Sequence, residues 1–277
     1  MLLSIQENEQ LKPERFIENP YGQTSKLQLT TGIKNGKTIL KHLFFTAPFK
    51  IISPFYDEYE TMIVMLLSVS AGIMEGDVQE IKVIVSKDTK MELSSQSYEK
   101  IHKMKHGCAI RKTEIYVESH AFLNYNPLPV IPYKDSSFEN RLDVELQDGT
   151  SAFQMCEILT CGRSACKERF EYHYYHSIVH VRKKGILVYR DNTRFNPKQT
   201  EMNGTGMYEG YTHLAMLLLY NMNKKEGWIV KVRKLMDSYQ NIEGGATCIQ
   251  DEGYLVRILG NNAQELQKIC QRISYIK

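Results

Sequence analysis

The segment LDVELQDGTSAFQMCEIL, residues 142–159, decides the fold class. From Leu142 to Leu146, apolar and polar residues alternate, which is the two-residue period of a half-buried strand. Asp148-Gly149 then turns the chain into a second apolar run from Ser151 to Leu159. The segment therefore predicts two β-strands joined by a turn.

The same signals recur over the first two-thirds of the chain. Alternating apolar residues predict strands from Ile81 to Val85 and from Arg111 to Glu118. Asn35-Gly36 and Lys183 to Gly185 predict tight turns between further strands, because Asn and Gly tolerate positive φ. This part of the chain is expected to be β-structure throughout.

The last fifty residues show a different period. Apolar residues at three- and four-residue intervals from Glu226 to Tyr239 predict an amphipathic helix that ends at Gly244-Gly245. Thr247 to Ile249 and Tyr254 to Leu259 predict a short strand pair. Asn261 or Asn262 is expected to cap a final helix.

The chain shows no interdomain linker. We therefore expect one domain over residues 1–277, with the helix–strand–strand–helix segment from about 226 to 277 packed on it. Asn192 to Gly206, rich in Asn, Thr, Gly and Pro, is the best candidate for a mobile loop.

Composition places the chain among ordinary globular proteins, with 42% hydrophobic and 24% charged residues. A net charge of +3 is too small to indicate a nucleic acid or an anionic membrane as partner. Met1 to Arg15 lacks the apolar core of a signal peptide, and no apolar stretch approaches the ~20 residues that cross a bilayer. Six cysteines without a disulfide-like spacing favour the cytoplasm.

No catalytic motif is visible. A nucleophile elbow, a phosphate-binding loop and a His-Glu-x-x-His helix are all absent from the sequence, so we expect no enzymatic activity. Histidines and cysteines occur only in loose groups without zinc-finger spacing, and we predict no stable metal site. The groups are Cys161 with Cys166; His102 with His106 and Cys108; and His173 with His176 and His180. On a strand, His173 would lie on the opposite face from His176 and His180.

Four segments combine turn glycines, prolines and polar side chains in a fixed order. Between Pro127 and Pro132, three prolines exclude a helix or a central strand and stiffen the chain. The segments are Ala71 to Asp77 with Gly72 and Gly76; Leu93 to Ile101 with Gln96 and Lys100; Leu123 to Tyr133 with Pro127, Pro129 and Pro132; and Cys161 to Phe170 with Gly162, Arg163, Ala165 and Glu168.

In this order, the four segments resemble the UreD/UreH family of urease accessory proteins. The Pro-rich segment and the segment from Gly162 to Phe170 carry most of the resemblance. Two glycine positions depart from the family pattern, because Ala71 and Lys167 stand where the family shows glycine. If the second position requires φ > 0, lysine there costs about 1 kcal/mol. In the second segment, serines replace the family's threonines and His102 replaces its aromatic residue.

The resemblance implies a mainly β fold of layered sheets, similar to a short β-helix, with two α-helices near the C-terminus. It implies a non-catalytic scaffold that helps to insert nickel into urease. The implied partners are the urease apoprotein, a UreF-like accessory protein and, through it, a UreG-like GTPase. The C-terminal helices and the Pro-rich segment are both candidate contact surfaces. No tightly bound cofactor is implied, only nickel in transit.

An internal tunnel for nickel needs oxygen ligands that hold the metal weakly. By resemblance, Asp77 and Glu168 are the transit candidates, with Gln96, Lys100 and Arg163 as accompanying polar residues. The alternative is structural: Asp77 caps a turn, and Glu168 pairs with Arg163 or with a neighbouring arginine. Two other functions also stay open, a β-rich binding module unrelated to urease and a cryptic metal-dependent hydrolase.

Overall fold

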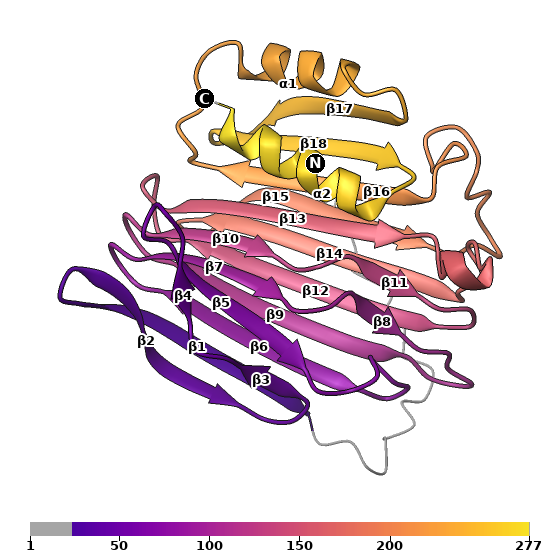
Figure 1. The fold of residues 1–277 in the computed structure, drawn as a ribbon, viewed down its shortest axis with the longest axis horizontal. Coiled ribbons are helices and arrows are strands. Elements are labelled where there is room, and N and C mark those ends of the chain that lie inside the picture. The colour runs from indigo at the N-terminus through magenta and orange to yellow at the C-terminus, as the bar shows by residue number, and fades with distance from the viewer. Residues whose placement is uncertain (1–23, 277) are drawn as a thin grey trace, which may run out of the picture.

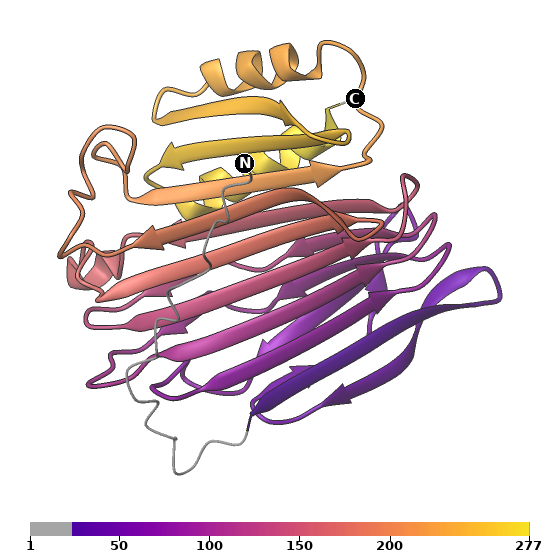
Figure 2. The ribbon, with the colours of Figure 1, turned by 180° about the vertical axis from the view of Figure 1, so that it is seen from behind.

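The computed structural model describes residues 24–276, so the expectation about Met1 to Arg15 lies outside the described residues. Two large β-sheets lie face to face, and two helices lie near the C-terminal end (Figures 1 and 2). The predicted class, a mainly β fold of layered sheets with two C-terminal helices, is confirmed. No helix within the described range is both long enough and apolar enough to cross a membrane.

The first sheet has seven strands in the order β15-β14-β12-β9-β6-β1-β2. Its five inner strands are parallel, whereas β2 and β15 join antiparallel at the two edges. The strands are β1 (Ser25–Lys34), β2 (Lys37–Phe45), β6 (Val78–Val85), β9 (Ala109–Val117), β12 (Ser137–Leu146), β14 (Tyr174–Lys183) and β15 (Ile186–Phe195).

The second sheet has eleven strands, with the path β17-β18-β16-β13-β10-β7-β5-β3 and three short strands beside it. The strands are β3 (Phe49–Ile51), β4 (Phe55–Tyr56), β5 (Met62–Ser68), β7 (Lys90–Ser95), β8 (Glu99–Ile101), β10 (Phe122–Asn126), β11 (Val130–Pro132), β13 (Ala152–Thr160), β16 (His213–Tyr220), β17 (Ile242–Ile249) and β18 (Gly253–Gly260).

The chain winds between the two sheets as in a short β-helix. Each coil runs from a strand of the first sheet to one of the second, and the first two coils add a short third strand: β6-β7-β8, β9-β10-β11 and β12-β13. Strands of successive coils pair in parallel. Asp148-Gly149 therefore carries the chain from one sheet to the other and does not close a hairpin.

The predicted strand faces and hairpin turns are confirmed. Leu142, Val144 and Leu146 are almost fully buried between the sheets, because their alternation in β12 places all three on the inner face. Asn35-Gly36 joins β1 to β2 with φ values of 51° and 76°, and Lys184-Gly185 joins β14 to β15 with φ values of 54° and 75°. Positive φ at both central residues is the geometry that matches strand twist.

The two predicted helices are present as α1 (Trp228–Asp237) and α2 (Ala263–Tyr275). Asn262 caps α2 by accepting a hydrogen bond from the Glu265 N–H at 3.0 Å. The expectation that Gly244-Gly245 ends the first helix is wrong, because both glycines lie inside β17. A Cβ on Gly244 would lie 2.6 Å from the Arg257 carbonyl oxygen, so glycine there permits close packing.

Two further expectations need correction. Asn192 to Gly206 is not all loop, because β15 extends through Phe195. The prolines do not exclude a strand either, since Pro132 ends β11, which lies between β8 and β13. The bonds along β8 run from the Glu99 N–H to the Pro129 carbonyl and from the Tyr133 N–H to the Ile101 carbonyl. Neither bond needs an N–H group from a proline.

Candidate functional site

The four segments that stood out in the sequence meet at one end of the molecule. Ile73 forms a parallel bridge with Ile101, and Ile101 pairs with Pro132. Two residues further on, the Lys134 N–H donates a hydrogen bond to Glu168 at 3.2 Å. Segments that are distant in the sequence thus lie next to one another in successive coils.

Glycine is required at two close backbone approaches in these segments. Gly72 has a φ of +147°, and a Cβ there would lie 2.4 Å from the Lys100 carbonyl oxygen. Gly162 has a φ of +142°, and its Cβ would lie 2.9 Å from the Glu168 carbonyl oxygen. Gly76 lies in a turn with a φ of 80°. Gly72 thus permits the close approach of the first two segments, and Gly162 permits a close approach within the fourth.

Asp77 closes a turn. Its Oδ2 accepts a hydrogen bond from the Met74 N–H at 2.8 Å, and the Asp77 N–H donates to the Met74 carbonyl at 3.2 Å. Burial raises the pKa of its carboxyl group. Asp77 lines neither of the two small cavities between the sheets. These contacts match the alternative in which Asp77 caps a turn.

Glu168 is held by two neighbouring residues. Arg163 binds it through two hydrogen bonds, the one from Nε being 2.8 Å long, and Lys134 donates its backbone N–H. Arg163 also lies over the Tyr133 ring, 4.1 Å from the centroid. The hydrogen bond from Arg163 holds the pKa of Glu168 below its usual value. This contact joins the third and fourth segments.

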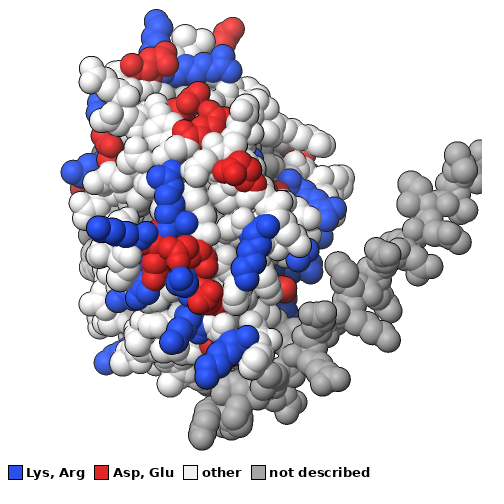
Figure 3. All heavy atoms as spheres, turned by 90° about the vertical axis from the view of Figure 1, so that its right-hand side faces the viewer, with Lys and Arg blue, Asp and Glu red and all other residues white. Residues whose placement is uncertain are grey.

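Gln96 and Lys100 are exposed, so the five polar candidates do not form one cluster. Figure 3 shows the end of the molecule at which the segments meet, where Lys and Arg side chains are mixed with Asp and Glu. An ion pair of 2.9 Å between Lys134 and Glu171 is one such contact. A surface of mixed sign lacks the basic stripe that nucleic-acid binding needs.

Lys167 occupies a left-handed position, with φ 58° and ψ 20°, at the end of a short 3₁₀ helix, Ser164–Cys166. Lys167→Gly is therefore expected to raise the free energy of unfolding by about 1 kcal/mol, because glycine adopts this conformation without strain. Urea denaturation measures the change. Lys103→Gly, at an exposed residue without positive φ, is the control and should give no gain. Equal effects of the two substitutions would contradict the strain argument.

A polar layer between the sheets was not predicted from the sequence. Arg111 of β9 is only 7% exposed, and it pairs with Glu99 of β8 at 2.5 Å. It also donates two hydrogen bonds to Gln79 of β6, at 2.9 and 2.6 Å. Burial disfavours the charge of Arg111, but Glu99 outweighs burial and raises its pKa. The three residues line or adjoin a cavity of about 60 Å³ that Tyr125 also lines.

Glu157 of β13 is a further charged residue between the sheets. Asn140 and Tyr175 each donate a hydrogen bond to its Oε1, at 3.3 Å. The half-buried side chain lines a second cavity, of about 40 Å³, together with Asp191 and Arg257, which pair with each other. Burial raises the pKa of Glu157 to about 7. Among the described residues, no cation lies within ion-pair distance of it.

Only one residue of this polar layer, Arg111, can be recognised from the sequence pattern. The inner face of β9 carries Ala109, Arg111, Thr113, Ile115 and Val117, so an arginine interrupts an otherwise uncharged face. Glu157 gives no such signal, because β13 is buried on both faces along most of its length. Only the pairing of distant strands brings these charges together.

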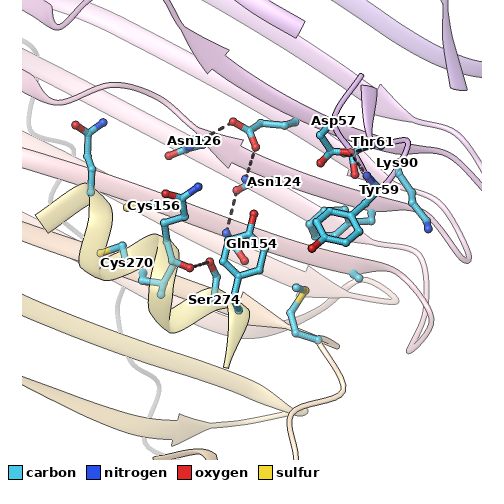
Figure 4. A pocket seen from close by; sticks show the side chains of 18 of the residues that line it. Asp57, Tyr59, Thr61, Lys90, Asn124, Asn126, Gln154, Cys156, Cys270 and Ser274 are labelled. Atoms are coloured by element: carbon cyan, nitrogen blue, oxygen red, sulfur yellow. Dashed lines mark hydrogen bonds between the residues drawn. The ribbon is translucent and has the colours of Figure 1, made fainter. Parts of the chain in front are cut away.

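A groove of about 740 Å³ lies on the outer face of the second sheet (Figure 4). Helix α2 forms one wall, and the turn that contains Tyr59 forms the other. Glu92, Asn124 and Gln154 cross its floor as a hydrogen-bonded row, at 2.8 and 3.2 Å. Asn and Gln are the most frequent residues in the lining, which also includes Cys156 and Cys270.

The candidate metal ligands remain dispersed. In residues 24–276, no three His, Cys, Asp or Glu side chains come together as a metal site. His176 contacts Asn192 at 2.8 Å, and His180 contacts Asp143 at 3.1 Å. Cys161 is buried, whereas Cys166 is exposed. In the part of the chain that the structure describes, these histidines and cysteines form no group of three that could hold a metal ion.

Comparison with known proteins gives one consistent result. The family model described as UreD urease accessory protein matches residues 23–276. The urease accessory protein UreD of Acetivibrio thermocellus is 36% identical over 261 residues, which cover 94% of this chain and 99% of the relative. UreH of Helicobacter pylori strain HPAG1 is 34% identical, covering 92% and 96%. UreD of Flavobacterium johnsoniae is 30% identical, covering 90% of each chain.

Proposed function

Because the chain belongs to the UreD family of urease accessory proteins, we propose that it is a non-catalytic scaffold through which nickel reaches the urease active site. Family membership removes the alternative of a binding module unrelated to urease. The proposed partners are the urease apoprotein, a UreF-like protein and, through it, a UreG-like GTPase, all in the cytoplasm. The lack of a phosphate-binding loop in the sequence supports leaving GTP hydrolysis to the GTPase.

The observation that carries the nickel part of the proposal is Glu157. Glu157 is half-buried and forms no ion pair within the described residues, and buried carboxylates are commonly paired or coordinate a metal. The cavity beside it also presents Asp191 and the Tyr175 ring to the same space. Carboxylate and hydroxyl oxygens hold Ni²⁺ weakly enough to release it. Glu99, which lines the cavity of about 60 Å³, is already paired with Arg111.

Asp77 and Glu168 fit the proposal less well. The carboxylate of Glu168 is committed to Arg163 and Lys134, and that of Asp77 to the Met74 N–H. We therefore propose Glu157 for nickel transit, with Asp77 and Glu168 holding the coils in place. In this form, the tunnel hypothesis keeps an interior route but changes the residues that line it.

Co-expression with urease and its other accessory proteins in nickel-containing medium tests this function. Glu157→Gln is expected to lower urease activity and urease-bound nickel by about tenfold, since it removes a charge from the route. Glu114→Gln is the matched control, because Glu114 is exposed on β9. Full activation by a folded Glu157→Gln variant would contradict the proposed route. Full activation without this chain would contradict the accessory function itself.

A further inference from the structure

An arginine lies at the end of a row of side chains that begins at Glu157. In the second sheet, Glu157 of β13 pairs with Met216 of β16, and Met216 pairs with Arg257 of β18. All three residues line the cavity of about 40 Å³. Neighbouring strands lie about 4.8 Å apart, so the backbones of Glu157 and Arg257 are about 10 Å apart. The row leads from a carboxylate between the sheets to a guanidinium near the molecular surface.

Asp191 faces this row from β15, the edge strand of the first sheet. Its carboxylate accepts hydrogen bonds from Arg257, from the Tyr189 hydroxyl at 3.3 Å and from the Thr193 hydroxyl at 2.8 Å. The Asp191 side chain is only 10% exposed, whereas that of Arg257 is 49% exposed. The carboxylate is thus fixed within the fold, and its cationic partner can move into solvent.

The charges around the cavity do not balance. Glu157 and Asp191 supply two carboxylates, and Arg257 is the only basic residue among the described residues that line the cavity. The guanidinium neutralises one negative charge, whereas a divalent cation between the two carboxylates would neutralise both. Carboxylate oxygens of this kind suit a divalent metal ion. A metal ion and Arg257 therefore compete for Asp191.

We propose that Arg257 is the gate of the route past Glu157, because its guanidinium pairs with Asp191 until Ni²⁺ replaces it between Asp191 and Glu157. This inference rests on the proposed nickel transit and adds the point at which the metal passes between solvent and the interior. No covalent bond changes, since one cation is exchanged for another. Arg257 is a positioning residue and does not bind the metal itself. Its removal should therefore strengthen metal binding, whereas removal of Asp191 should weaken it.

Titration calorimetry of the folded full-length chain with nickel chloride tests the gate in the absence of urease. Arg257→Ala is expected to raise the nickel affinity about tenfold, as for a site that is free of Arg257 about a tenth of the time. Asp191→Asn should cancel this gain, so that the double variant binds no more tightly than Asp191→Asn alone. Arg272→Ala is the control, since Arg272 is an exposed arginine that donates to the Tyr239 hydroxyl at 2.7 Å. It should leave the nickel affinity unchanged.

A second measurement needs no substitution. Phenylglyoxal labels free guanidinium groups, and peptide mapping gives the labelling rate of each arginine in the unchanged chain. Nickel chloride should raise the rate at Arg257, because its guanidinium is released, and leave the rate at Arg272 unchanged. The gate is overturned if nickel does not change labelling of Arg257, or if a folded Arg257→Ala variant binds nickel no more tightly than the unchanged chain.

The gate and the transit function can fail separately. If Arg257→Ala binds nickel more tightly but a folded Glu157→Gln variant activates urease fully, the exchange of cations is supported and the transit of nickel to urease is contradicted. If Glu157→Gln lowers urease activity but Arg257 responds in neither measurement, the transit function is supported and the gate is wrong.

Discussion

Gly72→Ala is expected to lower the free energy of unfolding by more than about 3 kcal/mol. The new Cβ would lie 2.4 Å from the Lys100 carbonyl oxygen, at a backbone φ of +147° that alanine rarely adopts. Relief requires separating Ile73 from β8, which breaks the 2.8 Å bond from its N–H to Lys100 and the 2.9 Å bond from His102. Urea denaturation, or the soluble fraction on expression, measures the loss.

Gly36→Ala separates the two causes of this loss, the steric contact of the new Cβ and the backbone strain. Gly36 has a φ of +76°, and no atom lies within 4 Å of the position that a Cβ would take, so only backbone strain acts there. We expect a cost of about 1 kcal/mol. If Gly72→Ala is no more destabilising than Gly36→Ala, the close approach of the first two segments does not constrain the fold.

Glu157→Gln is expected to make stability less dependent on pH. In the folded chain the pKa of Glu157 is raised from 4.5 to about 7, so its protonated form is favoured by folding. Its contribution is complete below about pH 4.5 and is lost as the pH rises through about 7. Full burial would make this loss about 3 kcal/mol, and the partial exposure of the side chain reduces the expectation to about 2 kcal/mol.

Denaturation at about pH 5 and about pH 8.5 provides the comparison. Glu157→Gln should match the unchanged chain at the lower pH and exceed its stability at the higher pH, since glutamine keeps the acceptor for Tyr175 and Asn140 without gaining charge. Glu114→Gln, on the exposed face, should follow the unchanged chain at both values. An equal difference at the two pH values would show that Glu157 is already ionised in the folded protein.

Some parts of the fold and the site are predictable from the sequence because their causes are local. The alternation from Leu142 to Leu146 identifies an inner face, and the turn residues Asn35-Gly36 identify a hairpin. The expectation for Lys167 is of the same kind, and its φ of 58° confirms a position that favours glycine. Family membership follows from motifs in order, which also need no knowledge of contacts.

Other parts depend on partners that the sequence does not show. Gly244-Gly245 has the composition of a helix end, but packing against β18 makes it part of a strand. The prolines predict no central strand at Pro132, yet the bonds along β8 use the Pro129 carbonyl and the Tyr133 N–H. Asp77 and Glu168 stand out in motifs, and the structure gives both carboxylates partners within the protein.

The sequence by itself determined that this chain is a β-rich member of the UreD family, because strand period, turn residues and motif order are properties of short segments. Only the tertiary structure decided where its interior charges lie. The pairing of Arg111 with Glu99 and the hydrogen bonds from Asn140 and Tyr175 to Glu157 join residues on different strands. Such contacts depend on the register of parallel coils, which no short segment encodes.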